Sequence, residues 1–236
     1  MFVFTSEALR TFDAGINTHP TMKKLLFLFV LSLSIWANAQ SSSQTINGHA
    51  SRYLFSPSGF GLEKDSSYVN IIQLFYGEFQ YGVNEHIAVG FGSLAFVGVY
   101  GTVTAHAQLA DKLNFKTGLL AGTTVFQGFY ALPFAVMTFG TPNNQFSLGF
   151  GRPFANFGGE FFSGRSFNAC GYHQLGKKTG FVYETWYLPG SETFIISPNL
   201  RVYSKANKSY YNLGLATISN YGDFFTLPTF SYAVYL

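Results

Sequence analysis

The chain has 236 residues, of which only 11% are charged, while aromatic residues reach 19%. Soluble domains carry about 25% charged residues, so a surface that faces water everywhere is hard to build from this composition. The formal net charge of +3 is small and no run of Lys and Arg occurs, which argues against nucleic-acid binding. The single cysteine, Cys170, excludes an intramolecular disulfide and cysteine-rich metal or iron–sulfur sites.

The first predicted element is an export signal. Residues 22–39, MKKLLFLFVLSLSIWANA, combine Lys23 and Lys24 with a short apolar core and the cleavage motif Ala37-Asn38-Ala39. The apolar core is shorter than the roughly 20 residues that a membrane-spanning helix requires. We therefore predict that residues 22–39 are cleaved, that residues 1–21 are an upstream extension, and that residues 40–236 form one domain. A retained membrane anchor is the alternative.

The rest of the chain is predicted to consist of β-strands. Residues 50–55, ASRYLF, alternate weakly and are assigned as the first strand, and a Tyr-rich run follows at residues 68–81. The clearest alternation is VYGTVTAHAQLA, where Val99 and its partners at every second position form one face. Residues 113–122 repeat this pattern. Because a shift of one residue exchanges the two faces of a strand, the split indicates two different environments.

Two kinds of connection alternate along the chain. Short turn-forming pairs occur at Asn84-Glu85, Asp111-Lys112, Asn143-Asn144, Lys177-Lys178 and Ala206-Asn207. Longer connections rich in Gly or Pro occur at residues 57–67, 155–164, 189–192 and 220–225, and tight ones occur near Phe96 and Gln127. Five short turns imply six outward hairpins, so we predict an all-β, closed, antiparallel up-and-down transmembrane β-barrel of twelve strands. The alternative is ten strands with a non-barrel segment at the N-terminus.

The chemistry of the two strand faces favours a membrane barrel over a soluble one. A soluble barrel has an apolar interior and a charged outer face. Here one face is rich in small uncharged polar residues, and the other carries bulky groups such as Phe146, Leu148 and Phe150. Such an apolar face fits a lipid-facing band with aromatic girdles. We therefore expect a location in the outer membrane of a Gram-negative bacterium. A secreted or periplasmic β-sandwich binding protein is the alternative.

Residues 51–93 resemble the N-terminal signature of a family of uncharacterised outer-membrane β-barrel proteins from Bacteroidota. The shared features are Arg52-Tyr53, Pro57-Ser58, a Tyr-rich strand from Tyr68 to Tyr81, the turn Gly82-Val83 and a Gly-rich strand from Val89 to Gly92. Residues 181–190, FVYETWYLPG, also resemble a later strand of that family. The resemblance implies a fold and a location, and it brings no known activity.

The predicted inward face carries charged side chains. We expect Glu78, His106, Lys116, Glu184 and Arg201 to face the lumen, with Gln80, Asn114, Gln145, Asn168, Asn199 and Asn212 around them. Ionisable groups inside a membrane protein are costly unless they are paired or hydrated. Two interpretations stay open: opposite charges brace a closed lumen across its width, or the charges line a pathway for small solutes. The first predicts no conductance and the second predicts measurable conductance.

The histidines form no catalytic or metal-binding pattern. The sequence contains no HExxH motif and no Ser-containing nucleophile elbow, and no pair of histidines has metal-ligand spacing. We therefore expect a structural or small-solute pore protein that is not an enzyme and holds neither metal nor cofactor. A lipid-modifying outer-membrane enzyme is the alternative, with His106 and His173 as its candidates.

The final stretch, TFSYAVYL, predicts the closing strand of the barrel. Its outward face is Phe230, Tyr232, Val234 and Leu236. Pairing with the first strand would leave no open edge in lipid. In the outer-membrane proteins that this chain resembles, such a strand is the recognition signal for the barrel-assembly machinery. The expected partners are therefore this machinery, outer-membrane lipid and small solutes, and no nucleic acid.

Overall fold

The computed structural model describes residues 49–94, 98–124, 128–204, 208–221 and 223–236. The predicted upstream extension, the export signal and the turn at Ala206-Asn207 lie outside these residues. Among the described residues, no helix has both the length and the apolar character needed to cross a membrane.

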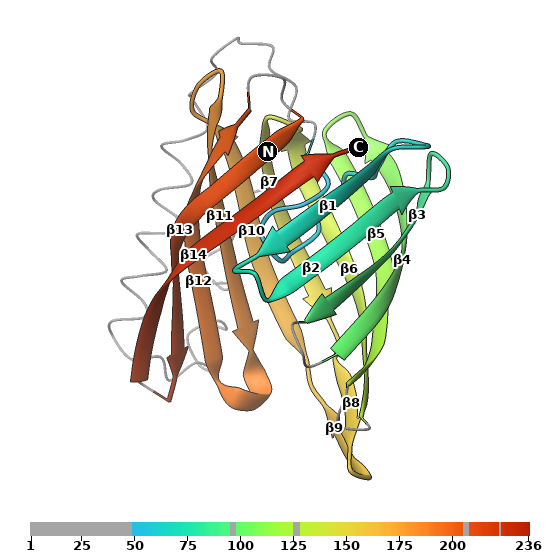
Figure 1. Ribbon diagram of the computed structural model, residues 1–236, viewed down its shortest axis with the longest axis vertical. Helices are drawn as coiled ribbons and strands as arrows, with labels where there is room; N and C mark the ends of the chain where they lie inside the picture. Colours follow the sequence, from blue (N-terminus) through green and yellow to red (C-terminus); the bar gives the residue numbers. More distant parts are fainter. Residues whose placement is uncertain (1–48, 95–97, 125–127, 205–207, 222) are drawn as a thin grey trace, which may run out of the picture. The chain divides into compact units, whose positions relative to one another are not determined.

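The predicted all-β architecture is confirmed: twelve antiparallel strands close into a barrel (Figure 1). In chain order these are β1 (Ser67–Ile72), β2 (Tyr76–Gly82), β3 (Ile87–Leu94), β4 (Gly98–Ala110), β5 (Leu113–Thr124), β6 (Phe129–Thr141), β7 (Asn144–Gly151), β10 (Ser166–Gln174), β11 (Thr179–Leu188), β12 (Thr193–Tyr203), β13 (Ser209–Asn220) and β14 (Asp223–Tyr235). A one-turn 3₁₀ helix, Pro189–Ser191, joins β11 to β12. Each strand pairs with its neighbours in the chain, which is the up-and-down order that was predicted.

The barrel closes between the last strand and the first. The β14 strand pairs with β1 in a register that places Tyr235 opposite Tyr68 and Tyr232 opposite Ile71. The backbone N–H of Leu236 extends this ladder by donating to the carbonyl of Ser67 over 3.0 Å. Closure satisfies backbone groups that would otherwise form an open edge.

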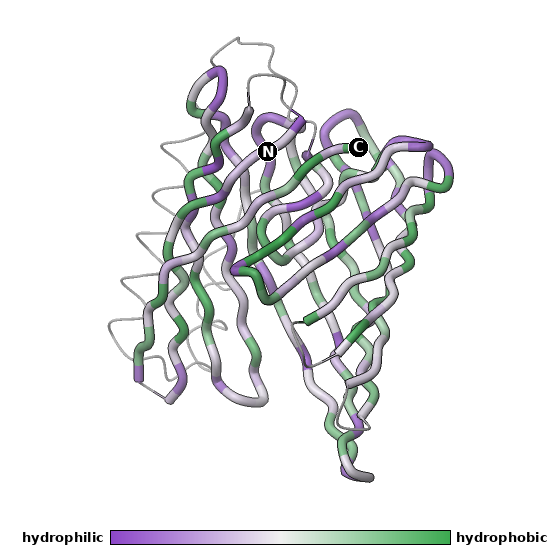
Figure 2. The backbone as a smooth tube through the Cα atoms, viewed as in Figure 1, coloured by the Kyte–Doolittle hydropathy of each residue, from purple (hydrophilic) through white to green (hydrophobic). Residues whose placement is uncertain are grey.

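The two faces of the strands differ in the way the alternation predicts. On β4, Val99 and Val103 are 60% and 48% exposed on the outer surface, while Tyr100 between them is only 5% exposed. Figure 2 shows the same alternation of apolar and polar residues along the strands around the barrel. The outer surface of the strands is therefore apolar, and polar side chains line the interior.

The predicted first strand, residues 50–55, is wrong. This segment makes no ladder with the barrel strands, and its only bridge joins Arg52 to Pro57 within the segment itself. The barrel still has twelve strands because the Tyr-rich run at residues 68–81 contains two strands, β1 and β2, where one was expected. The connection predicted at residues 57–67 therefore leads from the interior segment to β1.

The turn between β1 and β2 lacks the residues that usually announce a hairpin. Its two central residues, Gln73 and Leu74, have φ values of 51° and 60°. Positive φ at both positions is typical of a type I′ turn, which normally selects Asn or Gly. Backbone N–H groups hold the turn in place: Gln73 donates to the carbonyl of Phe230 over 2.8 Å, and Phe75 donates to Ile72 over 3.1 Å. Tertiary contacts with β14 thus fix a turn that local sequence does not favour.

The predicted connection at residues 155–164 forms a further hairpin. Strands β8 (Phe154–Phe157) and β9 (Glu160–Ser163) pair with each other, and β8 also pairs with the start of β6. Figure 1 shows this hairpin continuing the barrel wall beyond the neighbouring strands. Gly158 and Gly159 form its tip with positive φ values of 61° and 89°, which glycine adopts without steric cost.

Candidate functional site: the plugged lumen

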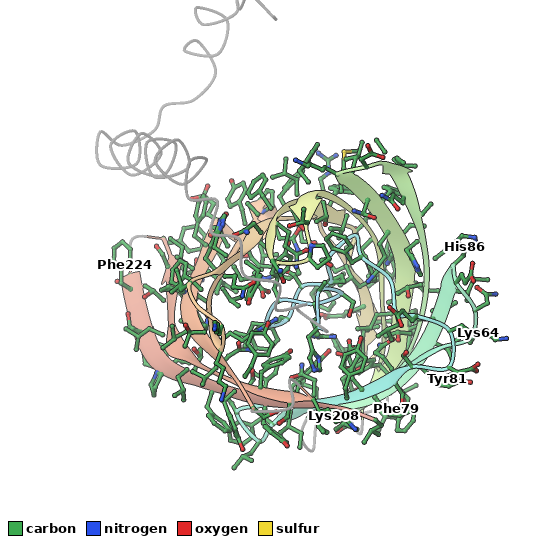
Figure 3. All side chains as sticks on the ribbon, turned by 90° about the horizontal axis from the view of Figure 1, so that it is seen from above. Lys64, Phe79, Tyr81, His86, Lys208 and Phe224 are labelled. Atoms are coloured by element: carbon green, nitrogen blue, oxygen red, sulfur yellow. The ribbon has the colours of Figure 1, made fainter. Side chains whose placement is uncertain are left out.

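The interior of the barrel contains a folded segment that we call the plug, residues 49–60. Seen along the barrel in Figure 3, the chain before β1 crosses the space enclosed by the strands. The plug is a tight turn: Tyr53 N–H donates to the carbonyl of Ser56 over 3.0 Å, and Ser58 N–H donates to that of Ser51 over 2.9 Å. Polar groups of the surrounding strands contact this turn from several sides.

Glu184 on β11 binds the tip of the plug. One carboxylate oxygen accepts hydrogen bonds from the backbone N–H groups of Leu54 and Phe55, both over 2.9 Å. The other accepts from the backbone N–H and the hydroxyl of Ser56, both over 2.9 Å, and from Trp186 Nε1 over 2.6 Å. Successive backbone N–H groups form an anion-binding nest. The buried carboxylate therefore finds in the plug the donors that compensate for its lost hydration.

Arg201 on β12 binds the plug from the neighbouring strand. Its guanidinium donates to the carbonyl of Tyr53 over 2.7 Å and to that of Arg52 over 3.4 Å. A further bond of 2.9 Å goes from Nε to the side-chain oxygen of Asn212 on β13. The ring of Tyr210 lies 4.0 Å from the guanidinium carbon. Carbonyl oxygens and an aromatic face thus stabilise a guanidinium that is 0% exposed.

The plug also contributes a charge of its own, Arg52, which forms an ion pair with Glu78 on β2. Tyr68 and Tyr76 complete the cluster, since the Tyr76 hydroxyl donates to Glu78 over 2.5 Å and Arg52 donates to that of Tyr68 over 3.3 Å. Burial alone would lower the pKa of Arg52. The Glu78 carboxylate and the two tyrosines outweigh that effect and raise the pKa well above its ordinary value.

Strands β5, β6 and β7 bind the two legs of the plug, the residues on either side of its tip, through weaker hydrogen bonds that mostly join neutral groups. Lys116 Nζ donates to the carbonyl of Ser51 over 3.3 Å. The backbone N–H of Gly59 donates to Thr138 Oγ1 over 2.6 Å, and the hydroxyl of Tyr53 lies 2.6 Å from that of Ser147. Lys116 is 5% exposed, and this carbonyl is the one acceptor recorded for it among the described residues.

The base of the plug is aromatic. The ring of His49 lies 4.5 Å from that of Tyr210 and 4.2 Å from that of Tyr235, both edge to face. Burial, and secondarily the nearby charge of Arg201, lowers the pKa of His49 from 6.5 to about 2. The imidazole is therefore neutral in the folded protein at every physiological pH.

The four predicted lumen charges, Glu78, Lys116, Glu184 and Arg201, are all buried. Among the described residues, no ion pair joins two of these wall charges. Each of them instead contacts the plug, Glu78 through the side chain of Arg52. This finding changes the bracing interpretation: the charges hold a segment inside the lumen and do not bridge it directly. His106 on β4 is only partly buried, and its ring packs against Gly61, where any β-carbon would overlap it.

The plug leaves part of the lumen unfilled. A cavity of about 100 Å³ lies between the plug and strands β1 to β7, β10 and β11. Its lining includes Arg52 and Phe55 from the plug, and Glu78, Lys116 and Trp186 from the wall. The lumen therefore contains both a folded obstruction and free volume beside it.

The predicted assembly signal lies on the outer side of β14. Phe230 is 39% and Leu236 is 70% exposed, and Tyr232 and Val234 are partly exposed, whereas Ser231 and Ala233 between them are buried. Tyr232 packs against Tyr211 of β13, with ring centroids 4.8 Å apart. The closing strand thus presents its alternate large side chains to the surroundings of the barrel.

The histidines and acidic residues bring no reactive cluster together. Within the described residues, no group of three or more His, Cys, Asp or Glu side chains could hold a metal ion. His86 and His106 have ring centroids 6.2 Å apart, and His173 stacks on Tyr183 at 5.9 Å. Both contacts are aromatic packing.

Sequence reasoning did not find the plug, although it found the wall residues that bind it. Leu54, Phe55 and Ser56 bind Glu184 through backbone N–H groups, and such groups leave no pattern in the sequence because they do not depend on side-chain type. The available signal was the poor alternation of residues 50–55, which supported the alternative of a non-barrel N-terminal segment. Arg52 in this stretch was a second hint, because a charge in a lipid-exposed strand would be costly.

Comparison with known proteins gives the fold a context. No protein-family model matches the chain, and no curated protein matches it. Among solved structures, the chain is similar to the KdgM porin in complex with disordered oligogalacturonate: the identity is 9%, 72% of this chain and 95% of that chain are covered, and the TM-score is 0.49. For the NanC porin the identity is 10%, the coverage is 72% and 97%, and the TM-score is 0.49. At these identities the likeness concerns the barrel architecture alone.

Proposed function

We propose that this protein is an integral outer-membrane β-barrel that admits small solutes and whose plug restricts their passage. The apolar outer surface supports insertion into lipid, and the polar interior supports contact with water and solutes. The observation that carries the proposal is the cavity of about 100 Å³ beside the plug. A lumen filled to the packing density of a protein core would have no such volume.

A reversible lock on the plug tests whether it controls passage. The hydroxyl of Ser56 at the plug tip donates to Glu184, which lies opposite Cys170 in the β10–β11 ladder, so Ser56→Cys places a second thiol close to the native one. We expect single-channel conductance of this variant in planar bilayers to be lower after oxidation than after reduction with dithiothreitol. The control is Ser191→Cys, whose site lies in the β11–β12 connection. A folded barrel that stays silent in both redox states contradicts the proposed pore.

Location in the outer membrane is tested through the closing strand. We propose that the outward residues Phe230, Tyr232, Val234 and Leu236 contact lipid and are read by the barrel-assembly machinery. Replacing both Tyr232 and Leu236 with Asp should prevent assembly, because lipid-facing charges are unfavourable. The matched control is Tyr221→Asp, since Tyr221 is 75% exposed in the β13–β14 connection. Heat-modifiable gel migration after membrane fractionation measures the outcome, and normal assembly of the double variant counts against the proposal.

The proposed outer-membrane location also requires export. We propose that residues 22–39 are removed and that the mature chain begins near Gln40, in keeping with the resemblance to Bacteroidota outer-membrane barrels. N-terminal sequencing of the membrane-inserted protein should give a start near Gln40. Recovery of Met1 or Met22 at the N-terminus of the inserted protein would contradict this processing.

A closed structural barrel is the second candidate function. The four hydrogen bonds from the plug tip to the Glu184 carboxylate favour it, because they hold the tip firmly. Such a barrel would present the β8–β9 hairpin to a partner. Phe161 and Phe162 on β9 are 61% and 52% exposed. This function predicts silence in both redox states of Ser56→Cys together with partner binding that is lost in Phe161→Ser.

We further propose that the protein is not an enzyme. The packing of the His106 ring against that of His86, and of the His173 ring on that of Tyr183, supports this. Replacing both with Gln should leave the lipid composition of the outer membrane unchanged, and altered lipid turnover would favour the alternative of a lipid-modifying enzyme.

A further inference from the structure

We propose that the lumen cavity binds a small amphipathic anion, with a carboxylate-type head and a short hydrocarbon chain. This inference rests on the proposed function, because it names the class of solute that enters the barrel. It follows from two chemically different ends of the cavity: a polar end with Lys116 of β5 and Ser51 of the plug, and an apolar end with side chains of β5 and β6.

The polar end of the cavity offers donors without matching acceptors. Lys116 is 5% exposed, lines the cavity and bonds to one backbone carbonyl. Ser51 beside it also lines the cavity, and its hydroxyl is buried without a hydrogen-bond partner among the described residues. Buried donors that lack an acceptor are destabilising unless a ligand or a water molecule accepts their hydrogen bonds. An anionic oxygen would accept from both.

The charge balance of the cavity selects an anion over a cation. Three charged side chains line it: Arg52, Glu78 and Lys116. Arg52 and Glu78 neutralise each other in an ion pair. Lys116 therefore supplies the excess charge, and in a surrounding of low dielectric constant its attraction for an anion is much stronger than in water.

The other end of the cavity is apolar. Along β5, Leu120 follows Lys116 on the inward face, and along β6 the residue paired with Leu120 is Leu132. Phe134 lies between Leu132 and Val136 on the same face, and Trp186 of β11 also lines the cavity. A neutral sugar would lose hydrogen bonds to water against these side chains without replacement. A hydrocarbon chain gains from the same contact.

The spacing of the two ends sets the size of the ligand. Lys116 and Leu120 are separated by four residues of a β-strand, which corresponds to ~13 Å along the barrel wall. An extended chain of the length of octanoate fits this distance, with its carboxylate at Lys116 and its methyl end beside Leu120 and Leu132. Acetate has the same head and would leave the apolar end empty.

Trp186 provides a reporter inside the proposed site. The chain contains two tryptophans, so Trp36→Phe in the full chain leaves Trp186 as the one tryptophan. In lipid nanodiscs, octanoate should shift the Trp186 emission in a saturable manner, and acetate should have no effect. Lys116→Met should weaken octanoate binding at least tenfold, while Lys116→Arg should retain it. The matched control is Lys112→Met, because Lys112 is an exposed residue of the β4–β5 turn.

The outcomes separate this inference from the proposed function. Absence of a saturable shift in a correctly folded barrel overturns the inference, and so does equal octanoate affinity in wild type and Lys116→Met. Either result leaves the pore proposal intact if the conductance of Ser56→Cys depends on the redox state. Saturable, Lys116-dependent binding in a barrel that never conducts supports the site and contradicts passage. Heat-modifiable migration of each variant shows whether it has folded.

Discussion

The two sides of the lumen treat the same plug differently. On one side, the clamp wall (strands β10 to β14), Glu184 and Arg201 bind consecutive backbone groups of the plug tip, and Tyr53 joins a buried cluster with Tyr172 and Tyr210. On the other side, the cavity wall (strands β2 to β6), contacts are fewer, and these strands supply most of the wall residues that line the cavity. The difference shows that a barrel can hold an interior segment mainly through one wall and keep free volume mainly along the other.

Glu184→Gln should produce the largest effect, since it attacks the clamp wall directly. An amide offers one acceptor oxygen to five donors and turns its NH₂ group toward some of them. We expect a loss of about 3–5 kcal/mol in the free energy of unfolding, as for a buried charge network that loses one partner, and a higher conductance. Urea unfolding in lipid vesicles measures the free energy of unfolding, and planar-bilayer recording measures the conductance. Glu192→Gln is the control because Glu192 is exposed, and equal stability of the two variants would refute a clamp at Glu184.

Gly59→Ala tests the contact between the plug and the cavity wall. A β-carbon at Gly59 would lie 2.5 Å from the backbone oxygen of Asn114 on β5, which cannot move away without shifting the strand. We expect a destabilisation of about 1–3 kcal/mol, as in an overpacked core, with a displaced plug leg. Gly190→Ala is the matched control, because nothing lies within 4 Å of a β-carbon there. A neutral Gly59→Ala would show that this leg is not held against β5.

Mild acid should weaken the base of the plug, where His49 meets the clamp wall. The pKa of His49 is lowered from 6.5 to about 2, so below pH 6.5 the unfolded chain binds a proton that the folded protein does not. Stability is therefore full above the unfolded pKa and falls as the pH decreases, by about 2 kcal/mol at pH 5 for this group. His49→Phe should remove this part of the dependence between pH 7 and pH 5. Parallel pH profiles for the two proteins would contradict the assignment.

Phe55→Ala should have the smallest effect. Phe55 is 42% exposed at the plug tip, and its ring meets that of Tyr76 edge to face at 5.9 Å. Loss of one such aromatic contact amounts to at most about 1 kcal/mol. Vesicle unfolding of this variant compared with Glu184→Gln measures the contrast between the walls. A loss as large as that of Glu184→Gln would show that the cavity wall holds the tip as firmly as the clamp wall does.

Much of the barrel could be predicted because its determinants are local. The alternation around Val99 and Thr102 reports two environments whatever the strand pairs with, and five polar turn pairs gave the strand number. The β1–β2 turn could not be predicted from the sequence, because Gln73 and Leu74 are not typical residues for positive φ. They adopt it where a backbone hydrogen bond from Gln73 to Phe230 of β14 fixes the turn. By contrast, the apolar alternation of TFSYAVYL was enough to predict a strand, because alternation does not depend on which strand it pairs with.

The sequence by itself determined that this protein has an apolar outer surface, a polar interior and charges at Glu78, Lys116, Glu184 and Arg201 on the inward face. Only the tertiary structure decided what those charges bind. The plug is recognised through backbone N–H and carbonyl groups of residues 52–56, and every residue type carries these groups. Side-chain patterns therefore predict the walls of the lumen, whereas the segment inside it becomes visible only once the chain is folded around it.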